Sequence, residues 1–281
     1  MKVALTEKPG PIGVFDSGYG GLTILHEIRQ LMPQYDYLYL GDNARTPYAT
    51  RSFEVVYEFT REAVQKLFDL GCHLVILACN TASAKALKTI QQNDLPQMEG
   101  ETRRVLGVIR PTAECIGQIT HSRHVGILAT SGTISSGSYP LEIRKLYPDI
   151  VVSGEACPMW VPLVENYEYD SPGADYFVEK RIGNLLRKDP AIDTIVLGCT
   201  HYPLLLNKIL KYTPRNVRIV PQGEYVAYSL KDYLQRHTEI ETLCTQSGTC
   251  RFLTTESPDK FMESASIFLR QHVEAERVVL E

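Results

Sequence analysis

The most informative stretch of this sequence is Thr194-Ile-Val-Leu-Gly-Cys-Thr-His-Tyr-Pro203, followed by Leu204-Leu-Leu-Asn-Lys-Ile-Leu210. A short β-branched run ends at Gly198 and apolar residues then recur at helical spacing, which predicts a buried strand followed by a helix. Cys199 lies at the junction between them. Backbone N–H groups and the positive end of the helix dipole favour a thiolate at such a position.

A second junction of the same kind lies upstream, in Leu74-Val-Ile-Leu-Ala-Cys-Asn-Thr-Ala-Ser-Ala84, where the cysteine is Cys79. Two more segments recur in the same order and at nearly the same offset. They pair Ile12-Gly-Val-Phe15 with Val125-Gly-Ile-Leu128, and Glu27-Ile-Arg-Gln-Leu-Met-Pro33 with Glu142-Ile-Arg-Lys-Leu-Tyr-Pro148. The chain therefore reads as two related α/β halves, each carrying one junction cysteine.

Composition limits the classes of function. With 281 residues, 44% of them hydrophobic and 22% charged, the chain has room for two domains of a soluble globular protein. A net charge of −4 argues against nucleic acid or an anionic membrane as partner. No apolar run approaches the roughly 20 residues of a membrane span. The polar segment from Met1 to Pro11 lacks the core of a signal peptide, so we expect a cytoplasmic protein.

We predict an α/β fold of two pseudo-symmetric domains, with mainly parallel central sheets, helices on both faces, and the active site in the cleft between them. The first domain would comprise residues 1–98 and 211–281 and carry Cys79. The second would comprise residues 99–210, open with a strand at Val105–Ile109, and carry Cys199. The sequence has no GxGxxG fingerprint and no Walker motif, so we expect no nucleotide cofactor.

The cysteine pattern argues against a metal or redox centre. No Cys-x-x-Cys pair occurs, and no cysteine pair with nearby histidines has the spacing of zinc ligands. We expect free thiols and no metal. Besides the two junction cysteines, we interpret the rest as small apolar packing residues. They are Cys72, Cys115, Cys157, Cys244 and Cys250.

Two cysteines that face one bound molecule from opposite sides suit the inversion of a stereocentre. Such a reaction needs a base on one face of a carbon and an acid on the other, and the two groups exchange protonation states at each turnover. The residues after each cysteine could hold an α-carboxylate at two helix N-termini. Asp16 and Glu165 could hold an ammonium group or tune a thiol, and the polar loop after Tyr37–Leu40 could orient a small zwitterion. These groups are Asn80, Thr81, Thr200 and His201 beside the cysteines, and Asp42, Asn43, Arg45 and Tyr48 in the loop.

Several motifs together resemble the glutamate racemases of the aspartate/glutamate racemase family. They are Phe15-Asp-Ser-Gly-Tyr-Gly-Gly-Leu-Thr23, Pro47-Tyr48, Ala78-Cys-Asn-Thr-Ala-Ser-Ala84, Ala129-Thr-Ser-Gly-Thr133 and Gly198-Cys-Thr-His-Tyr-Pro-Leu-Leu205. The resemblance spans roughly residues 11 to 237. It implies a cofactor-independent interconversion of L- and D-glutamate, supplying D-glutamate for peptidoglycan in the bacterial cytoplasm, and a homodimer.

By position, the resemblance assigns a role to each site residue. Cys79 would be the base acting on the D-enantiomer, and Cys199 the base acting on the L-enantiomer. Asp16, Glu165 and His201 would assist the thiols. The substrate contacts would be Asp16, Ser17, Tyr48, Ala49, Asn80, Thr81, Thr200 and His201. Two departures stand out, since the family usually has glycine at the position of Ala49, and Val220-Pro-Gln-Gly-Glu224 differs from its pattern.

Three alternatives stay open at this stage. One is a racemase of the same plan that acts on aspartate or another amino acid. Another is a thiol-redox or metal protein that uses Cys79 and Cys199, which the missing Cys-x-x-Cys pair disfavours. The last is a two-lobed solute-binding protein of the periplasmic type.

Overall fold

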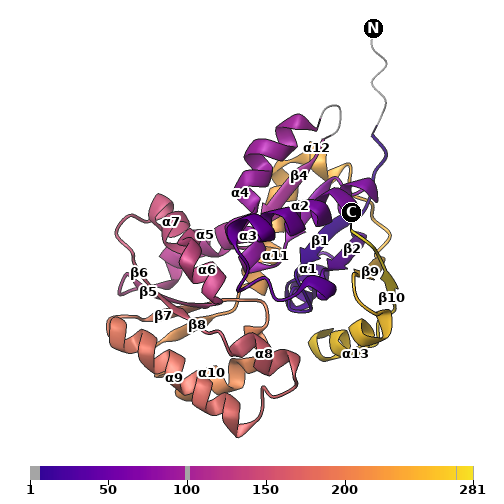
Figure 1. Cartoon of the computed structure of the whole chain (residues 1–281). Coiled ribbons are helices and arrows are strands. Elements are labelled where there is room, and N and C mark those ends of the chain that lie inside the picture. The colour runs from indigo at the N-terminus through magenta and orange to yellow at the C-terminus, as the bar shows by residue number, and fades with distance from the viewer. Residues whose placement is uncertain (1–6, 99–101, 270, 281) are drawn as a thin grey trace.

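The computed structural model describes residues 7–98, 102–269 and 271–280, and within them the chain forms two parallel β-sheets. One sheet has six strands in the order β10-β9-β2-β1-β3-β4, and the other has four in the order β6-β5-β7-β8 (Figure 1). The bounds of the first sheet are β1 (Ile12–Asp16), β2 (Tyr37–Gly41), β3 (Leu74–Leu77), β4 (Arg104–Gly107), β9 (Cys250–Thr254) and β10 (Ala275–Arg277). Those of the second are β5 (His124–Ala129), β6 (Val151–Ala156), β7 (Thr194–Gly198) and β8 (Arg218–Val220).

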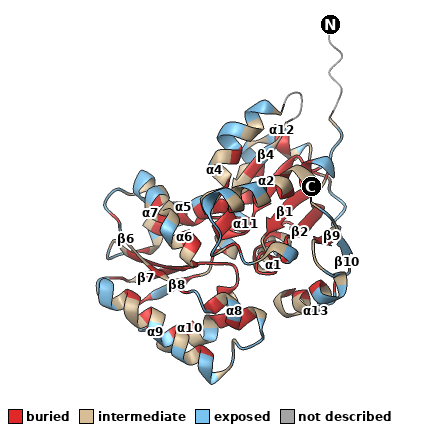
Figure 2. Ribbon diagram, viewed as in Figure 1, coloured by how far each residue is buried: buried red, intermediate tan, exposed pale blue. Residues whose placement is uncertain are grey.

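Helices cover both faces of each sheet, as predicted, and buried residues are concentrated in the strands and in parts of the helices (Figure 2). The buried apolar side chains form clusters between helix and strand. On the six-stranded sheet, one face packs against α1 (Leu22–Leu31), α11 (Gly223–Arg236) and α13 (Pro258–Leu269), and the other against α2 (Phe53–Asp69), α3 (Asn80–Lys85) and α4 (Leu87–Thr89). On the four-stranded sheet, one face packs against α8 (Trp160–Glu165), α9 (Pro172–Lys188) and α10 (Leu206–Tyr212), and the other against α5 (Ile109–Ile119) and α7 (Ser138–Leu146). The remaining α-helices are α6 (Ser131–Ser136) and α12 (Thr238–Glu241). None of the helices in the described ranges combines the length and apolarity that crossing a bilayer requires.

The duplication read from the sequence is visible in the strand order. The segment β2-β1-β3-β4 of the first sheet and the whole second sheet, β6-β5-β7-β8, have the same topology. The repeated Gly of Ile12-Gly-Val-Phe15 lies in β1, and its counterpart lies in β5. The repeated Glu-Ile-Arg lies in α1 and again in α7. Each half therefore places one cysteine after its third strand, at the carboxyl end of a parallel sheet.

Two strands lie on the other side of the boundaries that the sequence suggested. We expected Val105–Ile109 to open the second domain, but β4 pairs in parallel with β3 and completes the first set of four strands. We also expected residues from 211 onward to join the first domain, but β8 pairs with β7. The physical reason is the repeat itself, because each half needs its fourth strand at the sheet edge. The rest of the division stays a prediction, and its residues 1–6, 99–101, 270 and 281 lie outside the described ranges.

The C-terminal segment extends the first sheet, as we expected. β9 pairs with β2 and β10 pairs with β9, both in parallel. Between them, α13 brings Phe261 onto the sheet, where its ring lies 5.7 Å from Tyr19, 6.1 Å from Tyr39 and 6.4 Å from Phe252. Tyr19 belongs to the loop after β1, so this aromatic cluster connects the C-terminal segment to the loop that carries Ser17.

Truncation of this aromatic anchor should destabilise the protein strongly. Phe261 is fully buried, so Phe261→Ala should lower the free energy of unfolding by about 3–5 kcal/mol. Urea unfolding followed by circular dichroism measures the loss. Glu263→Ala, at an exposed position of the same helix, is the matched control and should change the free energy by less than about 0.5 kcal/mol. Equal effects of the two changes would show that α13 does not pack as described.

Candidate active site

Both junction cysteines lie in one buried pocket that the two halves form together. Cys79 is the N-cap of α3 and Cys199 follows β7 directly. Each thiol-bearing residue is only 6% exposed. The pocket is lined by Ser17, Thr46, Pro47, Tyr48, Ala49, Cys79, Asn80, Thr81, Thr130, Val161, Cys199, Thr200 and His201. The structure thus gathers every residue to which the resemblance assigned a substrate contact except Asp16. Of the loop residues that we expected to orient a zwitterion, Tyr48 lines the pocket and Asp42, Asn43 and Arg45 do not.

The surroundings of Cys79 favour the neutral thiol. Its Sγ lies 3.3 Å from Ser17 Oγ and accepts a hydrogen bond from the backbone N–H of Ala82 at 3.4 Å. Burial raises the pKa of the Cys79 thiol to about 12, the nearby charge of Asp16 acts in the same direction, and Cys199 adds a smaller repulsion. Without a ligand, Cys79 is therefore protonated at neutral pH and is set up to donate a proton.

Asp16 is a buried carboxylate with spare capacity to accept hydrogen bonds. It ends β1, is 1% exposed, and its Oδ2 accepts from the backbone N–H of Gly18 at 3.0 Å. Its Oδ1 has no hydrogen-bond partner among the described residues. Burial raises the pKa of Asp16, and the positive charge of His201 acts against that rise. An unpaired buried carboxylate oxygen is costly unless a cationic group meets it.

Cys199 has a different set of partners. His201 Nδ1 lies 3.9 Å from Cys199 Sγ, and His201 Nε2 lies 3.0 Å from Glu165 Oε1. Burial lowers the pKa of His201, but its hydrogen bonds to Cys199 and Glu165 outweigh burial and raise the pKa to about 10. His201 is therefore an imidazolium at neutral pH and can stabilise a thiolate at Cys199. Glu165, which we expected from the sequence to assist the thiols, contacts His201 directly and orients its ring.

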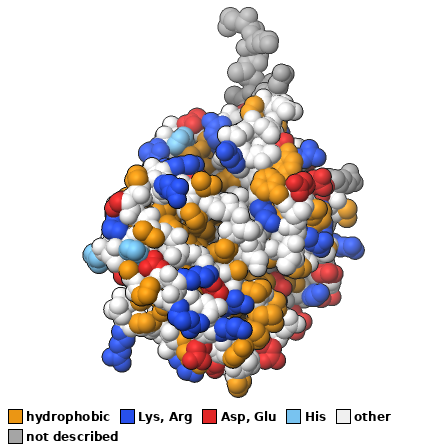
Figure 3. Space-filling view, turned by 60° about the vertical axis from the view of Figure 1, so that its left-hand side comes forward, with side chains coloured by type: hydrophobic (Ala, Val, Ile, Leu, Met, Phe, Trp, Pro, Cys, Tyr) orange, Lys and Arg blue, Asp and Glu red, His pale blue; other side chains and the backbone are white. Residues whose placement is uncertain are grey.

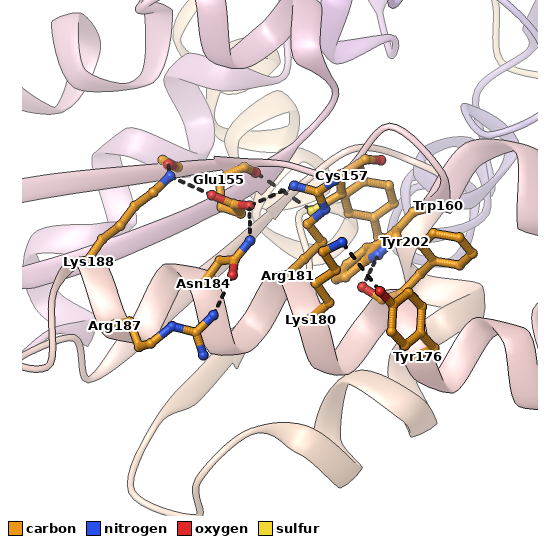
Figure 4. A network of polar contacts seen from close by, with 12 residues as sticks. Glu155, Cys157, Trp160, Tyr176, Lys180, Arg181, Asn184, Arg187, Lys188 and Tyr202 are labelled. Atoms are coloured by element: carbon orange, nitrogen blue, oxygen red, sulfur yellow. Dashed lines mark hydrogen bonds and ion pairs between the residues drawn. The ribbon is translucent and has the colours of Figure 1, made fainter.

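Tyr202, the residue after His201, belongs to a network of polar and aromatic contacts that includes residues of α8 and α9 (Figure 4). Tyr202 packs edge-to-face on Trp160 with 4.7 Å between ring centroids, and its hydroxyl donates to the carbonyl of Cys157 at 3.3 Å. Trp160 Nε1 donates to the carbonyl of Phe177 at 3.3 Å. On the same helix α9, Arg181, Asn184 and Lys188 hold the buried Glu155 of β6. Because Trp160 and Glu165 share α8, the contacts of Trp160 hold the helix that carries the Glu165 carboxylate.

The loop after β2 supplies a third wall. Tyr48 lines the pocket, but its hydroxyl donates to Asp42, which is also paired with Arg45. The Tyr48 hydroxyl is thus occupied by a contact within the protein, and the Tyr48 ring forms part of the pocket wall. Ala49 also lines the pocket. Among the described non-glycine residues only Arg123 and Tyr167 have positive φ, so alanine is accommodated at position 49 without backbone strain.

The contact between the halves is close because one position has no side chain. A Cβ at Gly20 would lie 2.3 Å from Thr200 Oγ1 and 2.4 Å from His201 Nδ1. The hydroxyl of Thr23, three residues after Gly20 in the chain, donates a hydrogen bond to the carbonyl of Thr200 at 3.0 Å. Glycine at position 20 therefore lets the loop after β1 meet the turn that follows Cys199.

Several residues of this site were missed in the sequence. Thr46, Pro47, Thr130 and Val161 line the pocket, and Thr130 Oγ1 lies 3.0 Å from Thr81 Oγ1 across the two halves. The hydroxyl-rich segment from Thr130 to Ser136, which forms α6 and its N-cap, follows β5 as Asp16-Ser-Gly follows the start of β1 in the other half, and this was the available signal for Thr130. Gln222, to which we assigned no role, accepts a hydrogen bond from Asn80 Nδ2 at 2.7 Å.

The remaining thiols behave as packing residues, and the described residues offer no cluster for a metal. All seven cysteines are free. Cys72, Cys157 and Cys244 are buried in apolar cores, and Cys250 packs at the edge of one. Cys115 is half-buried and donates to the carbonyl of Thr112. Within the described ranges, no group of three or more His, Cys, Asp or Glu side chains could hold a metal ion.

Removing the partner of His201 should lower the pKa of its ring. In Glu165→Gln we expect the pKa of His201 to fall by roughly 1–2 units from about 10, because a neutral amide stabilises the imidazolium less than a carboxylate does. Nuclear magnetic resonance titration of the imidazole nitrogens measures this. In the unaltered chain the raised pKa stabilises the folded state fully below pH 6.5, and that stabilisation is lost as pH rises toward 10.

The matched control for this titration is Glu155→Gln. Glu155 is a more deeply buried carboxylate of the same half, but its partners are Arg181, Asn184 and Lys188. The Glu155→Gln variant should therefore leave the pKa of His201 unchanged. A His201 ring that titrates near 6.5 in the unaltered chain would contradict the ion-pair arrangement.

Comparison with known proteins agrees with this geometry. Residues 22–223 match the family described as Asp/Glu/Hydantoin racemase. A glutamate racemase of Roseobacter denitrificans is 37% identical, over 94% of this chain and 98% of its own length. Among solved structures, the glutamate racemase isoform RacE1 of Bacillus anthracis superposes with a TM-score of 0.87 at 34% identity, covering 96% of this chain and 98% of its own. The Francisella tularensis glutamate racemase in complex with D-glutamate gives 0.84 at 31% identity, covering 99% of both chains.

The fold, the paired thiols and the extent of these matches lead to one conclusion. This chain belongs to the aspartate/glutamate racemase family and is an amino-acid racemase, an isomerase.

Proposed function

We propose that this racemase interconverts L- and D-glutamate by a two-base mechanism that uses Cys79 and Cys199 and no cofactor. The observation that carries the proposal is the pair of equivalent thiols, which reach one pocket from the two halves. The glutamate racemases that match over most of this chain support the choice of substrate.

In the direction from L-glutamate, Cys199 acts as a thiolate that removes the proton from Cα. The imidazolium of His201, held by Glu165, stabilises the thiolate before the proton moves. Cys79, neutral because of its raised pKa, then gives its proton to the opposite face of the carbon. One proton leaves Cα and one arrives, so the product is D-glutamate and the two thiols have exchanged protonation states. The reverse direction uses the same groups with their roles exchanged.

A thiolate alone cannot perform this step, because a proton next to a carboxylate is far less acidic than a thiol of pKa about 8.5. The pocket must therefore exclude water and place donors where negative charge develops on the substrate. The polar groups that follow each cysteine supply such donors to the α-carboxylate, namely Asn80 and Thr81 on one side and Thr200 on the other. Ser17, which lines the pocket beside Cys79, can accept a hydrogen bond from the substrate ammonium group, and the buried carboxylate of Asp16, the preceding residue, favours a cation there.

The wider role follows from the family. We propose that the D-glutamate serves peptidoglycan synthesis in the cytoplasm and that the working enzyme is a homodimer. Deleting the gene from its host should then create a requirement for D-glutamate. Light scattering of the purified protein tests the dimer.

Each thiol should be indispensable. Cys79→Ala and Cys199→Ala should each lower kcat/KM for glutamate racemisation by at least about 10³-fold, since each removes either the acid or the base of the proton transfer. Circular dichroism of D- or L-glutamate solutions follows the reaction. Cys115→Ala, which removes a half-buried thiol outside the pocket, is the control and should keep normal activity. Normal racemisation by either pocket variant would rule out the two-base assignment.

The substrate is decided by a panel of amino acids. With glutamate as substrate, kcat/KM should exceed that with aspartate by at least about 100-fold, because a site built for the longer side chain leaves buried polar groups unpaired when the shorter one binds. Higher kcat/KM with aspartate would assign the chain to the other branch of its family, with the same paired-thiol chemistry.

A further inference from the structure

A closed ring of three hydrogen bonds lies beside the pocket and joins both halves of the protein. Asn80 Nδ2 donates to Gln222 Oε1 at 2.7 Å, Gln222 Nε2 donates to the Tyr139 hydroxyl at 2.6 Å, and Tyr139 donates to Asn80 Oδ1 at 2.7 Å. All three residues are at most 3% exposed. They come from α3 after Cys79, from α7 of the other half, and from the N-cap of α11, where the chain crosses between the halves.

The direction of this ring is set by groups outside it. Gln222 Nε2 also donates to Thr112 Oγ1 at 2.8 Å and approaches the carbonyl of Val108 at 3.3 Å. Thr112 Oγ1 donates in turn to the same carbonyl at 2.9 Å, so it can only accept from Gln222. The amide of Gln222 therefore directs its oxygen to Asn80. That oxygen requires a donor, so Asn80 must present its nitrogen to Gln222 and its oxygen to Tyr139.

This orientation matters because Asn80 lines the pocket next to Cys79. An amide nitrogen has two N–H groups, and the ring uses one of them. With the oxygen turned to Tyr139, the amide can offer only its second N–H to a bound carboxylate. A flipped amide would instead present its oxygen, which would repel an anion.

The hydrogen-bonded ring also contacts the segment that carries the second thiol, Cys199. A Cβ at Gly198 would lie 3.1 Å from Tyr139 Cε2, so the tyrosine ring rests directly on the backbone that precedes Cys199. Tyr139 therefore contacts the Cys199 segment with its ring and the Cys79 segment with its hydroxyl. Gln222 donates to the Tyr139 hydroxyl from the point where the chain crosses between the halves.

We propose that Gln222 is a positioning residue that acts through Asn80 and Tyr139. It fixes the Asn80 amide in the orientation that binds the substrate α-carboxylate, and it fixes the two thiol-bearing segments relative to each other. The inference rests on the proposed glutamate racemisation and adds a residue of the Val220–Glu224 segment, in which this chain departs from the family pattern.

Gln222→Met keeps the length of the side chain and removes both hydrogen-bonding groups. We expect kcat for glutamate to fall roughly 10- to 100-fold, with a smaller change in KM, because the Asn80 contact strengthens as charge develops on the carboxylate. Tyr139→Phe removes one hydroxyl from the same ring and should give a similar loss. The double variant should have nearly the same kcat as either single variant, because both changes disrupt the same hydrogen-bonded ring.

The controls separate positioning from mere structural support. All rates are measured at a temperature where thermal melts show each variant to be folded, so that a purely structural role would leave kcat unchanged. Gln91→Met removes a glutamine that donates to the backbone carbonyl of Val105, away from the pocket, and should keep normal kcat. If Gln222→Met does not fold, Tyr139→Phe carries the test.

Two results would overturn the inference: normal kcat in folded Gln222→Met or Tyr139→Phe, and losses that simply multiply in the double variant. The unaltered chain is assayed alongside. If it does not racemise glutamate, the proposed function fails. If it does and the variants match it, only the role of Gln222 fails.

Discussion

The structure depends on one constraint: two parallel sheets must direct the carboxyl ends of their third strands at the same small volume. β3 and β7 occupy equivalent places in the two sheets, and each is followed within two residues by a cysteine. Parallel strands gather functional groups at that edge. The contact at Gly20, the Thr81–Thr130 hydroxyl pair and the Asn80–Gln222–Tyr139 ring all serve to hold the two edges together.

The two thiols are equivalent in topology but not in electrostatics. Cys79 faces Ser17 and lies near Asp16, and its raised pKa keeps it protonated. Cys199 faces the imidazolium of His201, whose other nitrogen is held by Glu165. Under the proposed mechanism such a difference is expected, because the three other substituents of Cα appear in mirror-image order when viewed from its two faces. The shared strand order accounts for the matched positions of the thiols, and the unlike neighbours give each thiol a different environment.

Much of this arrangement could be predicted from the sequence, because the deciding signals are local. The apolar runs before Cys79 and Cys199 and the repeated Glu-Ile-Arg segments predicted two parallel-sheet halves, which the structure confirms. Short edge strands were assigned to the wrong half, since β4 and β8 have little burial pattern of their own and their pairing is a long-range property. Gln222 and Tyr139 could not be found for the same reason, because a hydrogen-bonded ring drawn from three distant segments leaves no periodic trace in the sequence.

The two-base role of the paired thiols is tested most directly by racemisation in D₂O. The reaction is started from each pure enantiomer and stopped when the first few per cent of substrate has been converted. Because the group that donates the proton to the product is not the group that removed one from the substrate, the product should carry deuterium at Cα while the recovered substrate retains its hydrogen. The same result should hold from L- and from D-glutamate. Product that retains the substrate's own hydrogen from either side would show that one group performs both transfers, and would contradict the account.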